Sequence, residues 1–186
     1  MQLRRYAAQY YRQVEAFPRY VSGVHAQCDD AGARGELLEN LRVEEGGETT
    51  HAELWLRFCE GLGLSRDDVK ATPALPETSA CVSKMLAATR TQGYAAGLGA
   101  LYAYESQIPA VARTKIDGLA AHYGISDARA VSFFAEHLTA DEIHSRVEAA
   151  LLDGLDAAEA LAGADETLAA VNGLLDGVCR AAEVRA

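Results

Sequence analysis

Residues 101–109 read Leu-Tyr-Ala-Tyr-Glu-Ser-Gln-Ile-Pro, an apolar and aromatic segment with a single carboxylate at Glu105. Apolar side chains recur at spacings of three and four residues here and over almost the whole chain, which is typical of amphipathic helices. No run of alternating Val, Ile and Thr is long enough for a strand. The sequence therefore predicts an all-α fold. Pro109 predicts that the helix carrying Glu105 kinks or restarts there.

Local signals divide the chain into helices. Pro73 and Pro76 mark one irregular connection, and Ser65 begins a short turn. Thr139, with Glu142 three residues on, resembles a helix start with its capping acid. The predicted helices span residues 3–28, 32–43 continuing through 50–62, 77–91, 94–107, 109–123, 127–137, 139–162 and 164–182.

The chain has 186 residues, 49% of them hydrophobic and 24% charged, and it has no low-complexity linker. These values predict one folded domain over residues 1–186. The glycine-rich segment 93–99 lacks the Gly-Lys-Ser/Thr end of a phosphate-binding loop, so it indicates close helix packing.

Charge and cysteine usage exclude several classes of partner. Lys and Arg total 17 against 27 Asp and Glu, a formal charge of −10, which disfavours binding to nucleic acid or to an anionic membrane. The longest uncharged stretch, residues 91–104, is shorter than the roughly 20 residues that span a bilayer. The four cysteines form no Cys-x-x-Cys pair, and no apolar signal segment opens the chain. We expect free thiols and a cytoplasmic location.

Five histidines occur, and two of them flank an acid in the pattern His137, Asp141, His144. On a continuous helix these side chains would project within about 60° of one another, so they would be able to share a metal. Two imidazoles and a carboxylate suit iron or manganese with open positions. A solvated acidic helix with ordinary histidines is the alternative.

Two further segments carry candidate ligands. Glu44 and His51 lie two helical turns apart and share a face if the helix continues through Gly46-Gly47; alternatively, the glycines distort the chain and re-aim Glu44. Glu105 is isolated among apolar residues, and an unpaired buried carboxylate needs a cation or a hydrogen-bond network. For Glu105 alone, a core acid that bonds a neighbouring hydroxyl is an equal alternative. Together, these acids and histidines resemble in chemistry the dimetal sites of helical bundles.

Three strings of sequence, residues 39–55, 101–115 and 134–144, resemble the haem-oxygenase-like dimetal oxidases. Within that family they are similar to the group of the chlamydial protein associating with death domains (CADD), from about Leu3 to about His144, with the same ligand order and spacing. The resemblance implies a seven-helix bundle like that of TenA and PqqC, here lacking the family's first helix.

The resemblance also implies a metal centre of two ions, iron with iron or iron with manganese. Pyrroloquinoline quinone synthase and thiaminase-like relatives lack the full ligand set, which argues against their activities here. The six implied ligands are Glu44, His51, Glu105, His137, Asp141 and His144.

CADD-like proteins make the folate precursor 4-aminobenzoate from one of their own tyrosines, using oxygen activated at the metals and an amino group from a lysine. Lys115 matches that lysine, and Tyr6 and Tyr104 match tyrosines near the site. Phe133 stands where the relative has another tyrosine, and the family's usual donor tyrosine lies ahead of residue 1. Without the resemblance, Lys115 is either a solvated helix cation or a buried amine with a lowered pKa, and Tyr6, Tyr10 and Tyr11 are more typical of core aromatics than of redox relays.

Three functions compete at this point. The leading hypothesis is a dimetal oxygenase that makes 4-aminobenzoate from a protein tyrosine, with oxygen and a reductant as co-substrates. The second is a dimetal oxidase of a small external substrate, because one fold supports several chemistries. The third is a protein-interaction module, although no residue pattern encodes a death-domain partner. A homodimer is left open.

Overall fold

The computed structural model describes residues 2–183, which form ten helices and no strand, so the all-α prediction is confirmed. The helices are α1 (Gln2–Gln27), α2 (Ala31–Glu45), α3 (His51–Gly61), α4 (Arg66–Ala71), α5 (Pro76–Thr91), α6 (Tyr94–Glu105), α7 (Ile108–Tyr123), α8 (Ser132–His137), α9 (Ala140–Leu152) and α10 (Ala157–Glu183). Because α4 and α8 have six residues each, the described part contains eight longer helices, not the seven that the resemblance implies.

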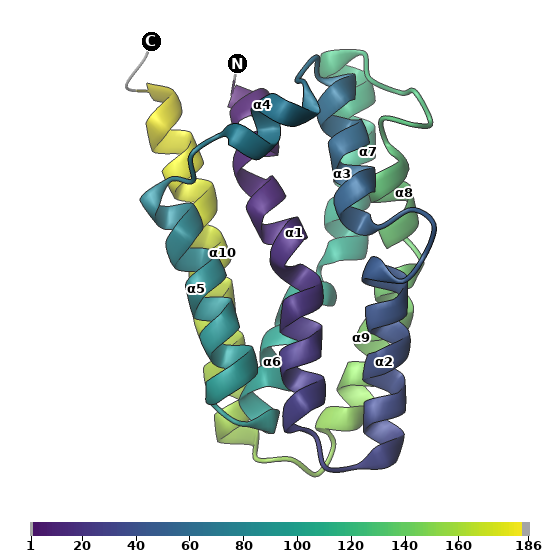
Figure 1. Cartoon of the computed structure of the whole chain (residues 1–186), viewed down its shortest axis with the longest axis vertical. Coiled ribbons are helices and arrows are strands. Elements are labelled where there is room, and N and C mark those ends of the chain that lie inside the picture. Colours follow the sequence, from purple (N-terminus) through teal and green to yellow (C-terminus); the bar gives the residue numbers. More distant parts are fainter. Residues whose placement is uncertain (1, 184–186) are drawn as a thin grey trace.

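The helix α1 runs through the middle of the bundle, between α5 and α10 on one side and α2, α3, α8 and α9 on the other (Figure 1). It contacts α2, α3, α5, α6 and α10. Tyr20, Val21 and Val24 of α1 have no exposed surface, as expected for a helix that is covered on several sides. The core therefore surrounds α1, and the candidate ligands of α2, α3, α8 and α9 lie on one side of it.

The helices α6 and α10 pack closely through glycine. A Cβ atom on Gly99 would overlap the carbonyl oxygen of Ala160, and one on Gly163 would overlap that of Ala96. The absence of side chains lets the two backbones touch. The prediction of close helix packing is thus confirmed at Gly99, and the contact fixes the position of the helix that ends at Glu105.

Proline and serine act as the sequence predicted. The helix α6 ends before Pro109, and α7 restarts with Pro109 in its first turn. Pro76 begins α5. The turn at Ser65 is the start of α4, where Ser65 Oγ accepts a hydrogen bond of 3.1 Å from the backbone N–H of Asp68.

The predicted boundary between the last two helices is wrong. The helix expected over 139–162 ends at Leu152, because Gly154 adopts a left-handed conformation with φ of +84°. The carboxylate of Asp156 then accepts hydrogen bonds from the N–H groups of Ala158 and Glu159, which starts α10. The break expected between residues 162 and 164 is absent from the continuous α10.

Two smaller expectations also fail. The helix expected over 127–137 begins only at Ser132, because the Asp127 side chain accepts hydrogen bonds from the N–H groups of Arg129 and Ala130 in a turn. The helix α9 does begin after Thr139, but the Thr139 side chain makes no capping hydrogen bond.

The cysteines are free thiols, as expected. None of the described helices is long and apolar enough to cross a membrane.

Candidate metal centre

A break between α2 and α3 sets the first pair of candidate ligands. The N–H of Gly46 closes the end of α2 by donating to the carbonyl of Arg42 over 2.9 Å, and Thr50 caps α3 by accepting from the N–H of Glu53. The predicted continuous helix through Gly46 is therefore wrong, and the alternative, a distortion at the glycines, is what the structure has. Glu44 and His51 still meet across the break, with Oε1 and Nδ1 2.8 Å apart.

A second break, at residues 138 and 139, separates His137 from Asp141 and His144. His137 is the last residue of α8, whereas Asp141 and His144 belong to α9. The prediction that these three residues form one stripe on a continuous helix is wrong. They instead divide between two neighbouring clusters.

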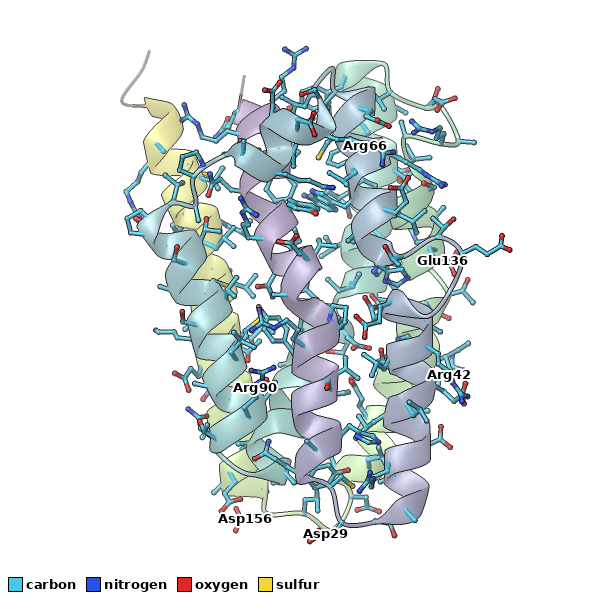
Figure 2. All side chains as sticks on the ribbon, viewed as in Figure 1. Asp29, Arg42, Arg66, Arg90, Glu136 and Asp156 are labelled. Atoms are coloured by element: carbon cyan, nitrogen blue, oxygen red, sulfur yellow. The ribbon has the colours of Figure 1, made fainter. Side chains whose placement is uncertain are left out.

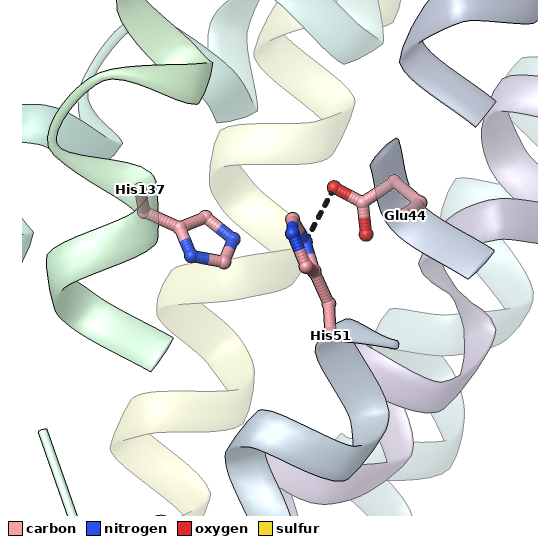
Figure 3. A group of neighbouring side chains, drawn as sticks. All are labelled: Glu44, His51 and His137. Carbon is pink, nitrogen blue, oxygen red and sulfur yellow. Dashed lines mark ion pairs between the residues drawn. The ribbon is translucent and has the colours of Figure 1, made fainter. Parts of the chain in front are cut away.

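The first cluster contains Glu44, His51 and His137, whose ligand atoms lie within 4.8 Å of one another (Figure 3). The imidazole rings of His51 and His137 have their centroids 4.4 Å apart. Nδ1 of His137 lies 2.6 Å from the carbonyl oxygen of Phe133. When Nδ1 donates this hydrogen bond, the Nε2 lone pair is left free for a metal.

The second cluster contains Glu105, Asp141 and His144, again with ligand atoms within 4.8 Å of one another. His144 Nδ1 lies 3.3 Å from Oε2 of Glu105 and 3.7 Å from Oδ1 of Asp141. The buried amide of Asn40 donates to both oxygens of Glu105, over 3.0 and 3.3 Å. This contact between α2 and α6 holds the carboxylate toward α9.

Burial affects the two clusters differently. In the first, it raises the pKa of Glu44 to about 8 and lowers the pKa of His51 to about 4, so both are neutral at pH 7. In the second, burial raises the pKa of Asp141 to about 6. Burial opposes the charged form of His144, but Asp141 and Glu105 outweigh it and raise the pKa of that imidazole to about 10. A histidine cation thus balances the second cluster when no metal is bound.

The donor set fits metal ions. All six side chains are buried, and the Nδ1 atoms of His51 and His144 have no hydrogen-bond partner of good geometry among the described residues. The small cavity that joins the clusters is lined by no lysine or arginine of residues 2–183, so the His144 imidazole is the only one of the six side chains that carries a balancing positive charge. Imidazole and carboxylate ligands together suit iron or manganese.

Sequence reasoning missed two polar residues beside this centre. Asn40 lies four residues before Glu44, and Glu148 lies four residues after His144, so helical spacing placed both on ligand-bearing faces. Glu148 is 1% exposed. Burial, together with the nearby charges of Glu105 and Asp141, raises the pKa of Glu148 well above its usual value.

Lys115, Tyr6 and Tyr104 line a second small cavity, of about 30 Å³, together with His137. The Nζ atom of Lys115 lies 3.8 Å from the centroid of the Tyr6 ring. Tyr104 shares a hydrogen bond of 2.7 Å with the hydroxyl of Tyr10, which stacks on Tyr6. The structure therefore brings the sequence-derived lysine and both tyrosines to the His137 side of the first cluster.

These helices form a haem-oxygenase-like bundle. A TenA homologue from Pseudomonas syringae superposes with a TM-score of 0.80 at 16% identity, over 98% of this chain and 79% of that one. A CADD-like protein of unknown function from Nostoc punctiforme gives 0.78 at 22% identity, over 96% and 81%. At these identities the likeness establishes the fold alone.

Sequence comparison then gives the family. Residues 4–173 match the haem-oxygenase-like family described as iron-containing redox enzymes, and the chain belongs to that family. It is 40% identical over 178 residues to the 4-aminobenzoate synthase of Chlamydia trachomatis, which covers 94% of this chain and 77% of the relative. The resemblance to CADD-like iron enzymes is confirmed.

Proposed function

We propose that this protein is a 4-aminobenzoate synthase that uses two metal ions, oxygen and a reductant to convert one of its own tyrosines. The observation that carries the proposal is the pair of buried clusters adjoining the cavity of Lys115, Tyr6 and Tyr104. The similarity to curated 4-aminobenzoate synthases supports it. As part of the proposal, the protein acts in the cytoplasm, with no nucleic acid or membrane as partner.

In this proposal, Glu44, His51 and His137 hold one ion, and Glu105, Asp141 and His144 hold the other. The ions, iron with iron or iron with manganese, supply oxygen activation when bound. Ion binding requires that Glu44 lose its proton and His144 its charge, because carboxylate and neutral imidazole are the coordinating forms. The two clusters therefore release protons as they fill.

The tyrosines are kept as neutral phenols. Burial raises the pKa of Tyr6 and of Tyr104 well above the ordinary value, so each hydroxyl keeps its proton at neutral pH. The hydrogen bond between Tyr10 and Tyr104 fixes where the Tyr104 hydroxyl points. Since Tyr104 directly precedes Glu105 on α6, a ring and a candidate ligand share one rigid helix.

Lys115 is the proposed source of the amino group. Burial lowers the pKa of Lys115 to about 8, so about one tenth of the amine is uncharged at pH 7, far more than for an ordinary lysine. Only the uncharged amine has the lone pair that a new carbon–nitrogen bond requires. Its position over the Tyr6 ring orients this nitrogen toward the aromatic cavity.

The test is a product count. Metal-free protein is loaded anaerobically with ferrous iron, given reductant and oxygen, and assayed for 4-aminobenzoate and for changes in peptide mass. We expect at most one product per chain and a mass loss in one tyrosine peptide, with Tyr6→Phe and Tyr104→Phe locating the donor. Lys115→Met should bind metal normally but form no product. Repeated turnover without any change in a tyrosine peptide contradicts the proposal.

A surface groove favours a second candidate, oxidation of a small external substrate. The groove has a volume of about 400 Å³ and is lined mainly by α7. Lys115 and Val111 line both this groove and the tyrosine cavity, so the two spaces adjoin. An added phenolic substrate that gives several products per chain would establish this candidate in place of the first.

A further inference from the structure

A cavity of about 320 Å³ opens between α2 and α9. Glu36, Glu39 and Glu136 lie at exposed positions of its lining, and Figure 2 shows Glu136 pointing outward on the side of the molecule that also carries Arg42. Arg42 pairs with Glu39, but no lysine or arginine among residues 2–183 lines the cavity itself. Its mouth is therefore acidic.

The inner end of this cavity reaches the second cluster. Its buried lining residues include His144, which belongs to that cluster, and Asn40, which donates to Glu105. The Oδ1 atom of Asn40 has no hydrogen-bond partner in the described chain. The cavity thus joins solvent to the Glu105, Asp141 and His144 cluster by a path independent of the tyrosine side.

Glu148 is the unexplained group of the cavity. It is 1% exposed, and neither of its oxygens accepts a hydrogen bond from any residue in 2–183. A buried carboxylate without a partner is unfavourable unless a cation approaches it. The neighbouring lining residues Leu37, Val43 and Val147 are apolar and offer no other partner for a charged ligand.

We propose that this cavity is the entry route for divalent metal ions and that Glu148 receives each ion before it reaches the second cluster. The inference rests on the proposed function, since it needs the metal centre. The acidic mouth concentrates hydrated cations. Inside, the oxygens of Glu148 and Asn40 replace part of the water shell, and oxygen donors suit ferrous iron and manganese.

Glu148 acts in transit because it does not complete a binding site. In the described part of the chain, two groups of three ligands lie within 4.8 Å, and Glu148 is in neither. A position with so few ligands holds a divalent ion weakly, so the ion moves on to the cluster that contains His144.

Metal loading kinetics test the inference on the full chain. Metal-free protein is mixed anaerobically with Co²⁺, whose visible absorption reports binding, and both the loading rate and the final number of ions are measured. Glu148→Gln removes the group that can become a carboxylate but keeps the shape, and Val43→Trp narrows the cavity from an exposed position. Glu142→Gln is the matched control, because Glu142 is an exposed acid of α9 outside the cavity lining.

We expect Glu148→Gln to load at least about tenfold more slowly, because an amide cannot release a proton to become the anionic ligand that the arriving cation requires. Val43→Trp should also load slowly, Glu142→Gln should match the parent, and all variants should finally bind the same number of ions. If Glu148→Gln and Val43→Trp both load Co²⁺ at the parental rate, the entry route is overturned, while the proposed metal centre is not affected. A lower final ion count in Glu148→Gln makes Glu148 a resident ligand and overturns transit. A parent that binds no Co²⁺ overturns the proposed metal centre itself, and this inference with it.

Discussion

The cluster of Glu44, His51 and His137 has two imidazoles and one carboxylate, whereas that of Glu105, Asp141 and His144 has the reverse proportion. The first adjoins the cavity of the tyrosines and Lys115, and the second adjoins the acidic cavity between α2 and α9. Two sites in one core can therefore differ in charge and in what they face. We expect the second cluster to bind its ion first and the first cluster to hold the ion nearest the tyrosines.

The largest effect should come from removing one imidazole from each cluster. In the variant His137→Ala with His144→Ala, metal content after anaerobic loading with ferrous iron should fall from about two ions per chain to near zero, because each cluster keeps only two ligands. Elemental analysis measures this. The double variant His25→Ala with His122→Ala is the control, since both histidines lie outside the clusters. Full metal content in the first variant would contradict the assignment of both sites.

Loss of Glu105 should prevent metal binding in the second cluster but not in the first. Glu105→Ala should retain about one ion per chain, in the first cluster, and its oxygen consumption on addition of iron should fall to background, because the chemistry requires both ions. Without metal, the variant should be less stable to urea than the parent, because the Asn40 amide loses its acceptor and the His144 cation loses one of its two carboxylate partners. Glu142→Ala is the exposed control. Oxygen consumption at the parental rate would exclude a role for Glu105.

The pH dependence of protein stability tests whether Lys115 is buried beside the tyrosines. Burial lowers its folded-state pKa to about 8, while in the unfolded chain the pKa is about 10.5. Below pH 8, Lys115 is charged in both states, and the folded state bears the cost of burying that charge. Between pH 8 and 10.5, Lys115 is uncharged in the folded state but still charged in the unfolded state. The free energy of unfolding therefore rises with pH over this range.

Lys115→Met should therefore be more stable than the parent at pH 7 by up to about 3 kcal/mol, less whatever the contact with the Tyr6 ring contributes. It should also lose the rise in stability between pH 8 and 10. Urea unfolding of the metal-free proteins at pH 7 and 9.5 measures both effects. A variant less stable than the parent at pH 7 would show that the charged amine is well accommodated. Ion binding in the second cluster should not change.

The smallest effect should come from Asn40, whose side-chain hydrogen bonds within residues 2–183 go to Glu105 of the second cluster. Asn40→Leu should weaken the binding of one ion by about tenfold, because Glu105 loses the hydrogen bonds that orient it. The other ion should bind as before, and calorimetric titration resolves the two events. Gln9→Leu, which removes a buried amide that bonds Pro73 and Leu75 instead, is the matched control. If the affinity for both ions fell equally, the two clusters would not be independent.

The fold class and the membership of the candidate site could be predicted from the sequence, because both depend on residue types and their spacing. Helical periodicity gave the all-α class, and Pro109 gave the restart after Glu105. The six acids and histidines do come together in two groups, although their role as ligands stays a prediction.

The sequence did not predict how the six candidate ligands divide between two clusters. The breaks at residues 46–50 and 138–139 depend on local capping and turn contacts, and spacing arithmetic assumes that such breaks are absent. Glu148 shares a face with His144, a signal that was available. That its oxygens have no partner depends on which side chains the distant helix α2 presents.

The glycine contact between α6 and α10 has a consequence for mutational tolerance. Exposed positions of α10, such as Leu161 and Leu168, are free to vary. Position 163 should accept glycine alone, because even a methyl group overlaps the carbonyl oxygen of Ala96. Selection for metal chemistry therefore constrains a helix that contributes no candidate ligand, and a saturation library over α10 would show a sharp minimum of accepted residues there.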